Sequence, residues 1–213
     1  WIGNRCLNEE CDTTTGTELY YRLFEHDGTQ VGETHSLEDL SAHTSHLYRE
    51  AVSTAAGPDG SVGFAYVKYS PTEDGSAILN LYYAAIDADG AILVEPVSVT
   101  QNETPIYDPT EGQNSGPRFD QPNLSYTADE HIIFSWERSS GLYGTALDDI
   151  YTAVMDTDGT FLQTPRKLTN DTGDTSGYHS PTVTHLMSNK ALIAWSSWLR
   201  TGTRAERSPP AMR

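Results

Sequence analysis

The chain of 213 residues carries 13 basic and 30 acidic residues, which gives a formal net charge of −17 at pH 7. A field of that sign repels nucleic acids and anionic lipids, so we expect neither as a partner. No apolar run approaches the ~18 residues that a transmembrane helix needs, and the sequence therefore predicts no membrane span.

Two cysteines, Cys6 and Cys11, lie close together near the N-terminus. Their short separation suits a small disulfide loop in an exported protein, and two free thiols are the alternative. Two ligands alone are too few for a structural metal site. We expect residues 1–16 to form an N-terminal extension around this loop. A composition rich in Thr, Ser, Gly and Asp with few Lys also favours a secreted or cell-surface protein.

One segment occurs three times along the chain, as LYYRLFEHDGTQV (19–31), LYYAAIDADGAIL (81–93) and IYTAVMDTDGTFL (150–162). Each copy places Asp-Gly between two runs of β pattern, which is a strong signal for a tight hairpin turn. Apolar residues fall on both faces of each run, so we expect strands that are covered on both sides. The copies align on Gly28, Gly90 and Gly159.

A second unit alternates with the first, over residues 52–66, 122–136 and 181–195. Each copy reads as a strand, a polar turn and a second strand that ends on an aromatic residue. These aromatic residues are Tyr66, Trp136 and Trp195. Because they share one position of the repeat, we expect them to pack between neighbouring sheets.

The two units together predict four-stranded antiparallel sheets that recur along the chain. Such repeats are typical of the blades of a β-propeller, so the predicted fold class is all-β. The predicted order is a half-blade, two full blades, a complementary half-blade and a C-terminal tail. Their ranges are 17–38, 44–101, 115–170, 176–198 and 199–213.

The Asp-rich turn between the third and fourth strands resembles the blade repeats of secreted bacterial and archaeal β-propeller proteins. That resemblance covers residues 17–198 and implies a propeller fold. Sialidase-type propellers are a more distant match, because their turn carries an "Asp box", Ser-x-Asp-x-Gly-x-Thr-aromatic. In EHDGTQV, DADGAIL and DTDGTFL the Ser is missing and Asp adjoins Gly.

Three blades cannot surround an axis, since propellers have four to eight. Two solutions remain open. A homodimer could pair each C-terminal half-blade with the N-terminal half-blade of the second copy, which makes six blades. Alternatively, the remaining blades belong to a longer chain.

Charged and aromatic residues gather where the first strand of each blade begins. In propellers this rim is the usual place for a ligand, and an ion pair that merely neutralises itself is the alternative. We therefore predict a polar-ligand site at the rim. Its residues are Arg49, Glu50, Arg118, Asp120, Tyr178 and His179.

The Asp-rich turns raise the question of calcium. Asp87, Asp89, Asp156 and Asp158 are explained by turn chemistry without a metal, and no further carboxylates follow at EF-hand spacing. The loop containing Asp171 and Asp174 is a somewhat better candidate for a cation. We predict no cofactor, with Ca²⁺ as the alternative.

The sequence favours a non-catalytic extracellular binding or scaffold module that recognises a polysaccharide or a protein partner. The alternative is a propeller glycosidase or lyase, sialidase-like, with Asp120, Glu50 and His179 as acid and base at the rim. A repeat protein that only associates with itself is the third possibility. Fold alone does not choose between them.

Overall fold

The computed structural model describes residues 2–6, 14–38, 46–71, 77–102, 116–140, 147–170, 176–186 and 190–199. Every regular element in these ranges is a β-strand, and all paired strands are antiparallel. The all-β fold class predicted from the repeats is confirmed.

Two four-stranded sheets form the centre of the molecule, and they are the two full blades that the sequence predicts. In each sheet the strands lie side by side in chain order. The first blade contains β4 (His46–Ala56), β5 (Val62–Pro71), β6 (Ala77–Ile86) and β7 (Ile92–Ser98). The second blade contains β8 (Arg118–Tyr126), β9 (His131–Ser140), β10 (Leu147–Asp156) and β11 (Phe161–Lys167).

The N-terminal sheet has three strands, in the order β1 (Ile2–Cys6), β2 (Thr14–Phe24) and β3 (Gln30–Glu38). The sequence places residues 1–16 in an extension outside a two-stranded half-blade. In the structure, β1 instead pairs with the first part of β2, from Ile2 opposite Leu19 to Cys6 opposite Thr14. The Cys6–Cys11 disulfide stays a prediction, because Cys11 lies outside the described residues.

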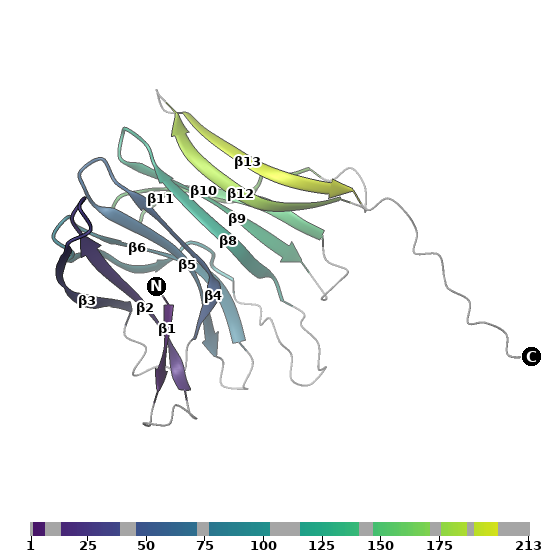
Figure 1. The fold of residues 1–213 in the computed structure, drawn as a ribbon. Helices are drawn as coiled ribbons and strands as arrows, with labels where there is room; N and C mark the ends of the chain where they lie inside the picture. Colours follow the sequence, from purple (N-terminus) through teal and green to yellow (C-terminus); the bar gives the residue numbers. More distant parts are fainter. Residues whose placement is uncertain are drawn as a thin grey trace, which may run out of the picture.

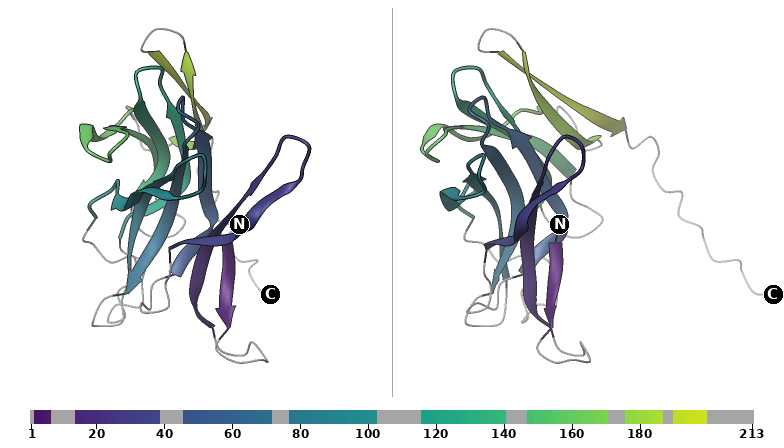
Figure 2. Two further views of the ribbon diagram at one scale, coloured as in Figure 1. Left: turned by 90° about the vertical axis from the view of Figure 1, so that its left-hand side faces the viewer. Right: turned by 60° about the vertical axis from the view of Figure 1, so that its left-hand side comes forward.

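The C-terminal hairpin consists of β12 (Ser176–Leu186) and β13 (Lys190–Leu199), as expected for a half-blade. The predicted tail after Leu199 lies outside the described residues. The four sheets stack beside one another in chain order and together form an arc (Figure 1). β4, β8 and β12 are each the first strand of their sheet. They are neighbours from one sheet to the next, so they line the inner side of the arc. Figure 2 shows the same succession from two other directions.

Apolar side chains fill the two interfaces that involve the first blade. One face of that blade packs on the N-terminal sheet and the other on the second blade, as the apolar residues on both faces of each strand predict. Tyr66 and Trp136 are 0% and 1% exposed in these interfaces. Trp195 is 42% exposed in the single chain, so its predicted packing between sheets is not found among the described residues. The reason is that the described residues provide no sheet beyond β13 to cover it.

The Asp-Gly turns have the conformation that the sequence predicts. Gly90 has a φ of +88°, a region that glycine adopts without a steric penalty. The Asp87 carboxylate accepts hydrogen bonds from the backbone N–H groups of Asp89 and Ala91, at 2.9 and 2.8 Å. These contacts make the aspartate part of the turn itself.

Candidate functional site

Two β-bulges shape the inner strands at the rim. The pairing of β8 with β9 shifts between Asp120 and Asn123, and that of β12 with β13 shifts between His179 and Thr182. Inside each bulge one non-glycine residue has a positive φ, +48° at Gln121 and +54° at Ser180. An extra residue in a strand reverses which face the preceding side chains occupy. The bulges therefore decide where Asp120 and His179 point.

Charged side chains gather on one face of the second blade, the face toward the C-terminal hairpin. Asp120 of β8 lies directly opposite Glu137 of β9. One step closer to the rim, Arg118 of β8 and Asp148 of β10 both lie opposite Ser139 of β9. Residues opposite one another in a sheet share a face, so these charges are neighbours.

His179 of β12 completes the group from the neighbouring sheet. Its Nδ1 lies 3.1 Å from Oε1 of Glu137, and its Nε2 lies 3.5 Å from Oδ2 of Asp148. The imidazole thus sits between two carboxylates of the second blade. We call Asp120, Glu137, Asp148 and His179 the rim cluster.

Polar contacts hold the C-terminal hairpin in place. Asn123 Nδ2 donates to the carbonyl oxygen of Pro181 at 3.0 Å, and the His185 N–H donates to Ser125 Oγ at 3.0 Å. This interface differs from the apolar ones around the first blade. The two directional bonds fix the position of β12, the strand that carries His179.

Glu137 is the most buried acid of the rim cluster, with 8% of its surface exposed. Burial raises the pKa of its carboxyl, the contact with His179 opposes that rise, and the charges of Asp148 and Asp120 add to it. Its Oε2 is buried and has no hydrogen-bond partner among the described residues. A buried carboxyl with a raised pKa holds its proton to higher pH than an exposed one.

The pKa of Asp148 is also raised, and burial is again the main cause. Burial raises the pKa of its carboxyl, whereas the nearby His179 and Arg118 lower it and Asp149 raises it. Asp149 itself points to the other face, where Lys167 Nζ lies 2.7 Å from its Oδ2. Two carboxyls of the rim cluster therefore hold their protons to higher pH than exposed carboxyls do.

The rim cluster offers two kinds of chemistry. One ligand atom each from Glu137, Asp148 and His179 lie within 4.8 Å of one another, a separation that a single divalent cation can bridge. The same groups can hold and transfer protons, because acids with raised pKa values adjoin an imidazole. Asp171 and Asp174, the cation candidates of the sequence, lie outside the described residues.

The structure brings three of the predicted rim residues together, namely Arg118, Asp120 and His179. Tyr178 precedes His179 on β12, so strand alternation directs it to the other face. The predicted residues Arg49 and Glu50 lie in β4 at the equivalent point, and their side chains lie outside what the structure describes.

Sequence reasoning missed Glu137 and Asp148, which neither the repeat nor a motif singles out. Both carry a signal that could have been used. They flank the loop between the second and third strands of the second blade, which opens at the same rim as the start of the first strand.

No protein-family model matches the sequence, and no curated protein matches it. Among solved structures, the chain is similar to an endo-arabinase from Bacteroides thetaiotaomicron VPI-5482, with 13% identity and a TM-score of 0.43, over 84% of this chain and 60% of that one. It is also similar to an α-L-arabinanase from Penicillium chrysogenum complexed with arabinobiose, with 13% identity and a TM-score of 0.35, over 79% and 62% of the two chains. The chain thus spans about 60% of the length of these structures. The described residues contain no helix that is long and apolar enough to cross a membrane.

Proposed function

We propose that the rim cluster is an acid–base site that hydrolyses a glycosidic bond in a neutral polysaccharide outside the cell. The observation that supports this most is the state of Glu137. It is a buried carboxyl with a raised pKa, and a second carboxylate, Asp120, lies directly opposite it across β8 and β9. Paired carboxyl groups in different environments are the usual machinery of glycoside hydrolysis.

Each member of the rim cluster has a separate role in this proposal. Glu137 donates its proton to the leaving-group oxygen as the bond from that oxygen to the anomeric carbon breaks. Asp120 accepts a proton from the water that attacks the anomeric carbon. His179 positions the Glu137 carboxyl, and the charge of Asp148 opposes the loss of the Glu137 proton.

The charge of the chain selects the substrate class. A net charge of −17, with three carboxyls and one arginine at the rim, disfavours sulfated or uronate-rich polymers. A neutral polysaccharide meets no such repulsion, and its hydroxyl groups can both donate to carboxylates and accept from Arg118.

One observation favours a second function, recognition of a polysaccharide or protein without turnover. The imidazole of His179 occupies the space between Glu137 and Asp148. The carboxyl groups of a glycosidase flank the scissile bond with room for the sugar and water. If Asp120 is not the partner of Glu137 in catalysis, the rim cluster is an ion-pair network that binds hydroxyl groups only.

Reducing-end release from a panel of neutral polysaccharides, including arabinan, xylan, galactan and mixed-linkage β-glucan, separates the two functions. We expect release by the wild-type chain and a loss of at least ~100-fold in Glu137→Gln and in Asp120→Asn, the usual contribution of a proton-transfer group. Glu95→Gln, on the exposed face of β7, is the matched control and should keep full activity. Retention of a polymer in affinity electrophoresis with no release from any substrate would support recognition instead. Equal release by wild type and Glu137→Gln contradicts the proposal.

A further inference from the structure

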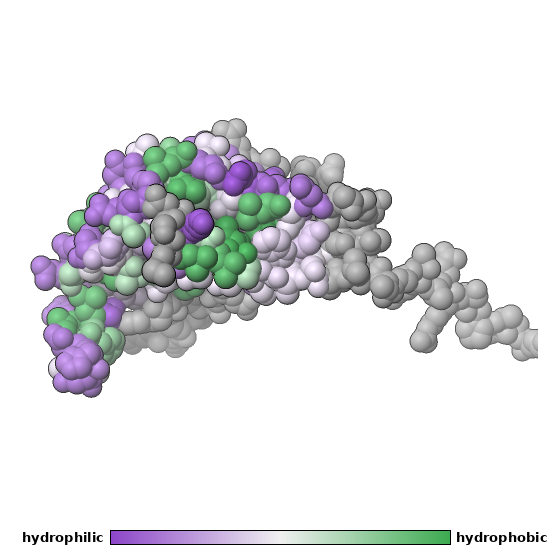
Figure 3. Space-filling view, turned by 90° about the horizontal axis from the view of Figure 1, so that it is seen from above, coloured by the Kyte–Doolittle hydropathy of each residue, from purple (hydrophilic) through white to green (hydrophobic). Residues whose placement is uncertain are grey.

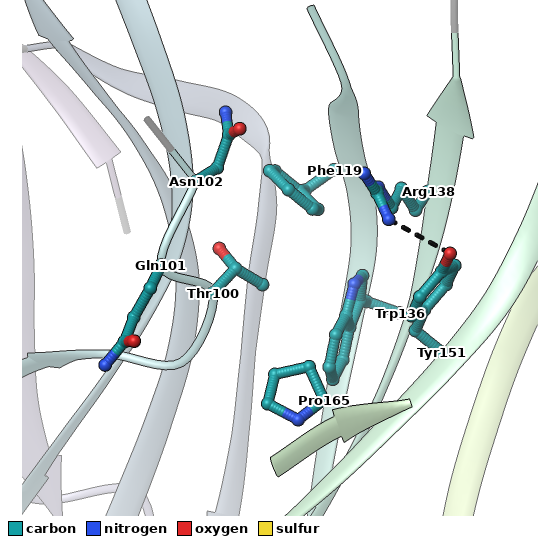
Figure 4. A pocket seen from close by; sticks show the side chains of 8 residues that line it. All are labelled: Thr100, Gln101, Asn102, Phe119, Trp136, Arg138, Tyr151 and Pro165. Atoms are coloured by element: carbon teal, nitrogen blue, oxygen red, sulfur yellow. Dashed lines mark hydrogen bonds between the residues drawn. The ribbon is translucent and has the colours of Figure 1, made fainter. Parts of the chain in front are cut away.

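A second site lies on the opposite face of the second blade, where it meets the first blade. The cavity there has a volume of about 230 Å³. One wall is the segment after β7, and the other is formed by side chains from the strands of the second blade (Figure 4). We call it the interblade pocket, and it is lined by Thr100, Gln101, Asn102, Phe119, Trp136, Arg138, Tyr151 and Pro165.

Two buried hydrogen-bond donors in this pocket are unsatisfied. Trp136 Nε1 and Arg138 Nε have no hydrogen-bond partner in the part of the chain that the structure describes. Arg138 uses Nη1 to donate to the Tyr151 hydroxyl at 3.0 Å (Figure 4). A buried donor without an acceptor destabilises the folded state, and native structures contain few of them. The pocket therefore lacks an acceptor.

The preceding interface, between the N-terminal sheet and the first blade, has the same arrangement with the acceptor present. Tyr66 stacks on Tyr82 at 5.9 Å, and Lys68 Nζ lies 5.0 Å from the centre of the Tyr82 ring. In the second blade, Trp136 stacks on Tyr151 at 6.0 Å, and Arg138 Cζ lies 5.1 Å from the centre of the Tyr151 ring.

The acceptor in that earlier interface is the carboxylate of Glu38, from β3. Its Oε2 accepts a hydrogen bond from the Tyr66 hydroxyl at 3.0 Å, and its Oε1 forms an ion pair with Lys68 Nζ. The side chains of Glu38 and Lys68 are each 12% exposed. One carboxylate thus satisfies both the aromatic donor and the cation.

The repeat places Thr100 where the earlier interface has Glu38. Gly28 and Gly90 are 62 residues apart, and so are Glu38 and Thr100. Their neighbours on the adjacent strand, Leu19 and Leu81, are also equivalent in the repeat. Glu38 pairs with Leu19, and the Thr100 N–H donates to the Leu81 carbonyl. The Thr100 hydroxyl cannot replace the carboxylate, because it accepts from the Leu81 N–H and donates to an oxygen of Asn80, both at 2.9 Å.

We propose that the interblade pocket binds a small organic carboxylate, which takes the place that Glu38 fills in the preceding interface. The carboxylate oxygens accept from Trp136 Nε1 and from the guanidinium of Arg138, a planar donor group that suits a carboxylate. Hydrogen bonds between a guanidinium and a carboxylate are stronger than those to a neutral acceptor.

The rest of the pocket selects the body of this ligand. Phe119, Trp136 and Pro165 give the pocket flat apolar surfaces beside the donors, as the sticks in Figure 4 show. The wall across from them is held in place by Asn102, whose backbone N–H donates to Asn80 Oδ1 at 2.8 Å. A volume below the range of drug-sized ligands admits one ring, so benzoate and glucuronate are suitable probes.

Calorimetric titration of the full chain with benzoate and glucuronate tests the proposal, with benzamide and glucose as neutral matches. We expect at least one acid to bind at least tenfold more tightly than its neutral match. Arg138→Gln should remove that preference, whereas Arg166→Gln, on the exposed outer strand β11, should keep it. Equal affinity for acid and neutral match, or no binding of either acid, overturns the proposal.

Thr100→Glu provides a second test that does not depend on how well Arg138→Gln folds. This variant restores to the pocket the carboxylate of the preceding interface. We expect it to abolish binding of the acid probes and to raise the melting temperature above that of Thr100→Gln. Undiminished binding of the probes by Thr100→Glu shows that they bind elsewhere and overturns the proposal. Hydrolysis at the rim cluster does not enter either readout.

Discussion

Glu137 carries a cost in stability, and the proposed function gives it a chemical role. Its carboxyl is almost fully buried, one oxygen has no partner among the described residues, and its main neighbour is a histidine. Removing a carboxylate from water disfavours its charged form, which is why burial is the largest cause of its raised pKa. Structures often retain such a group where a proton must be transferred.

The pH dependence of stability should reveal this group. Because the folded state holds the Glu137 proton to higher pH than the unfolded state, the free energy of unfolding falls as pH rises from about 4.5, the ordinary value, through the folded pKa. Asp148 contributes with the same sign. Glu137→Gln removes the buried charge and should be more stable than wild type at pH 7, by about 1 kcal/mol or about 2–4 °C in melting temperature.

Thermal unfolding of wild type and Glu137→Gln between pH 4 and pH 8 measures this difference. The gap between the two melting temperatures should widen as the pH rises. Glu95→Gln, which changes an exposed carboxyl, should follow wild type throughout. A variant that is less stable than wild type at pH 7 would show that Glu137 is stabilised as a carboxylate.

At the scale of the strand, the bulges decide which residues the sequence could reveal. Asp120 and His179 occupy equivalent positions of the repeat, so alignment alone finds both. Glu137 is different, because finding it requires the register of β8 against β9. Counting outward from the turn, with Leu124 opposite Phe134, places Gln121 opposite Glu137. The bulge shifts the pairing by one residue, so that Asp120 lies opposite Glu137 instead of Gln121. No sequence pattern predicts that shift.

The backbone at the bulge provides a test. Ser180 has a φ of +54°, a conformation that costs a non-glycine residue on the order of 1–3 kcal/mol. Ser180→Gly relieves that cost and should leave the free energy of unfolding unchanged or raise it by up to about 1 kcal/mol. Thr182→Gly, an exposed position in the regular part of the same strand, should lower it by about 0.5–1 kcal/mol. Urea unfolding of both variants measures the contrast, and equal losses would mean that β12 has no bulge.

At the scale of the whole molecule, the repeat predicts the sheets well because apolar positions recur in phase on both faces of each blade. The repeat predicts the two ends of the arc, the N-terminal sheet and the C-terminal hairpin, less well. The N-terminal sheet gains β1, a strand that the repeat lacks, and the C-terminal hairpin leaves Leu192 and Trp195 half exposed. Seen from above, the surface carries apolar patches between hydrophilic areas (Figure 3).

We predict that a second copy of this chain covers the exposed face of β13 and the edge with which no other described strand pairs. In both blades the second strand pairs with the third strand. β13 is a second strand by its place in the repeat, and β2 is a third strand, so β13 of one copy can pair with β2 of the other. Among the described residues, β1 pairs with β2 from Thr14 to Leu19, and the prediction places β13 of the second copy beyond Leu19. Light scattering should give about 47 kDa, twice the 23.4 kDa of one chain. Trp195→Glu should return the mass to that of one chain, and a wild-type monomer at high concentration contradicts the prediction.

The pH profile of kcat/KM for polysaccharide cleavage tests the central claim, that Glu137 donates a proton at the rim, most directly. For wild type we expect activity to fall as pH rises through the raised pKa of Glu137, because the acid is then lost. Glu137→Gln should be at least ~100-fold less active, and that descending limb should be absent. A variant with wild-type activity and an unchanged profile would show that the proton comes from another group.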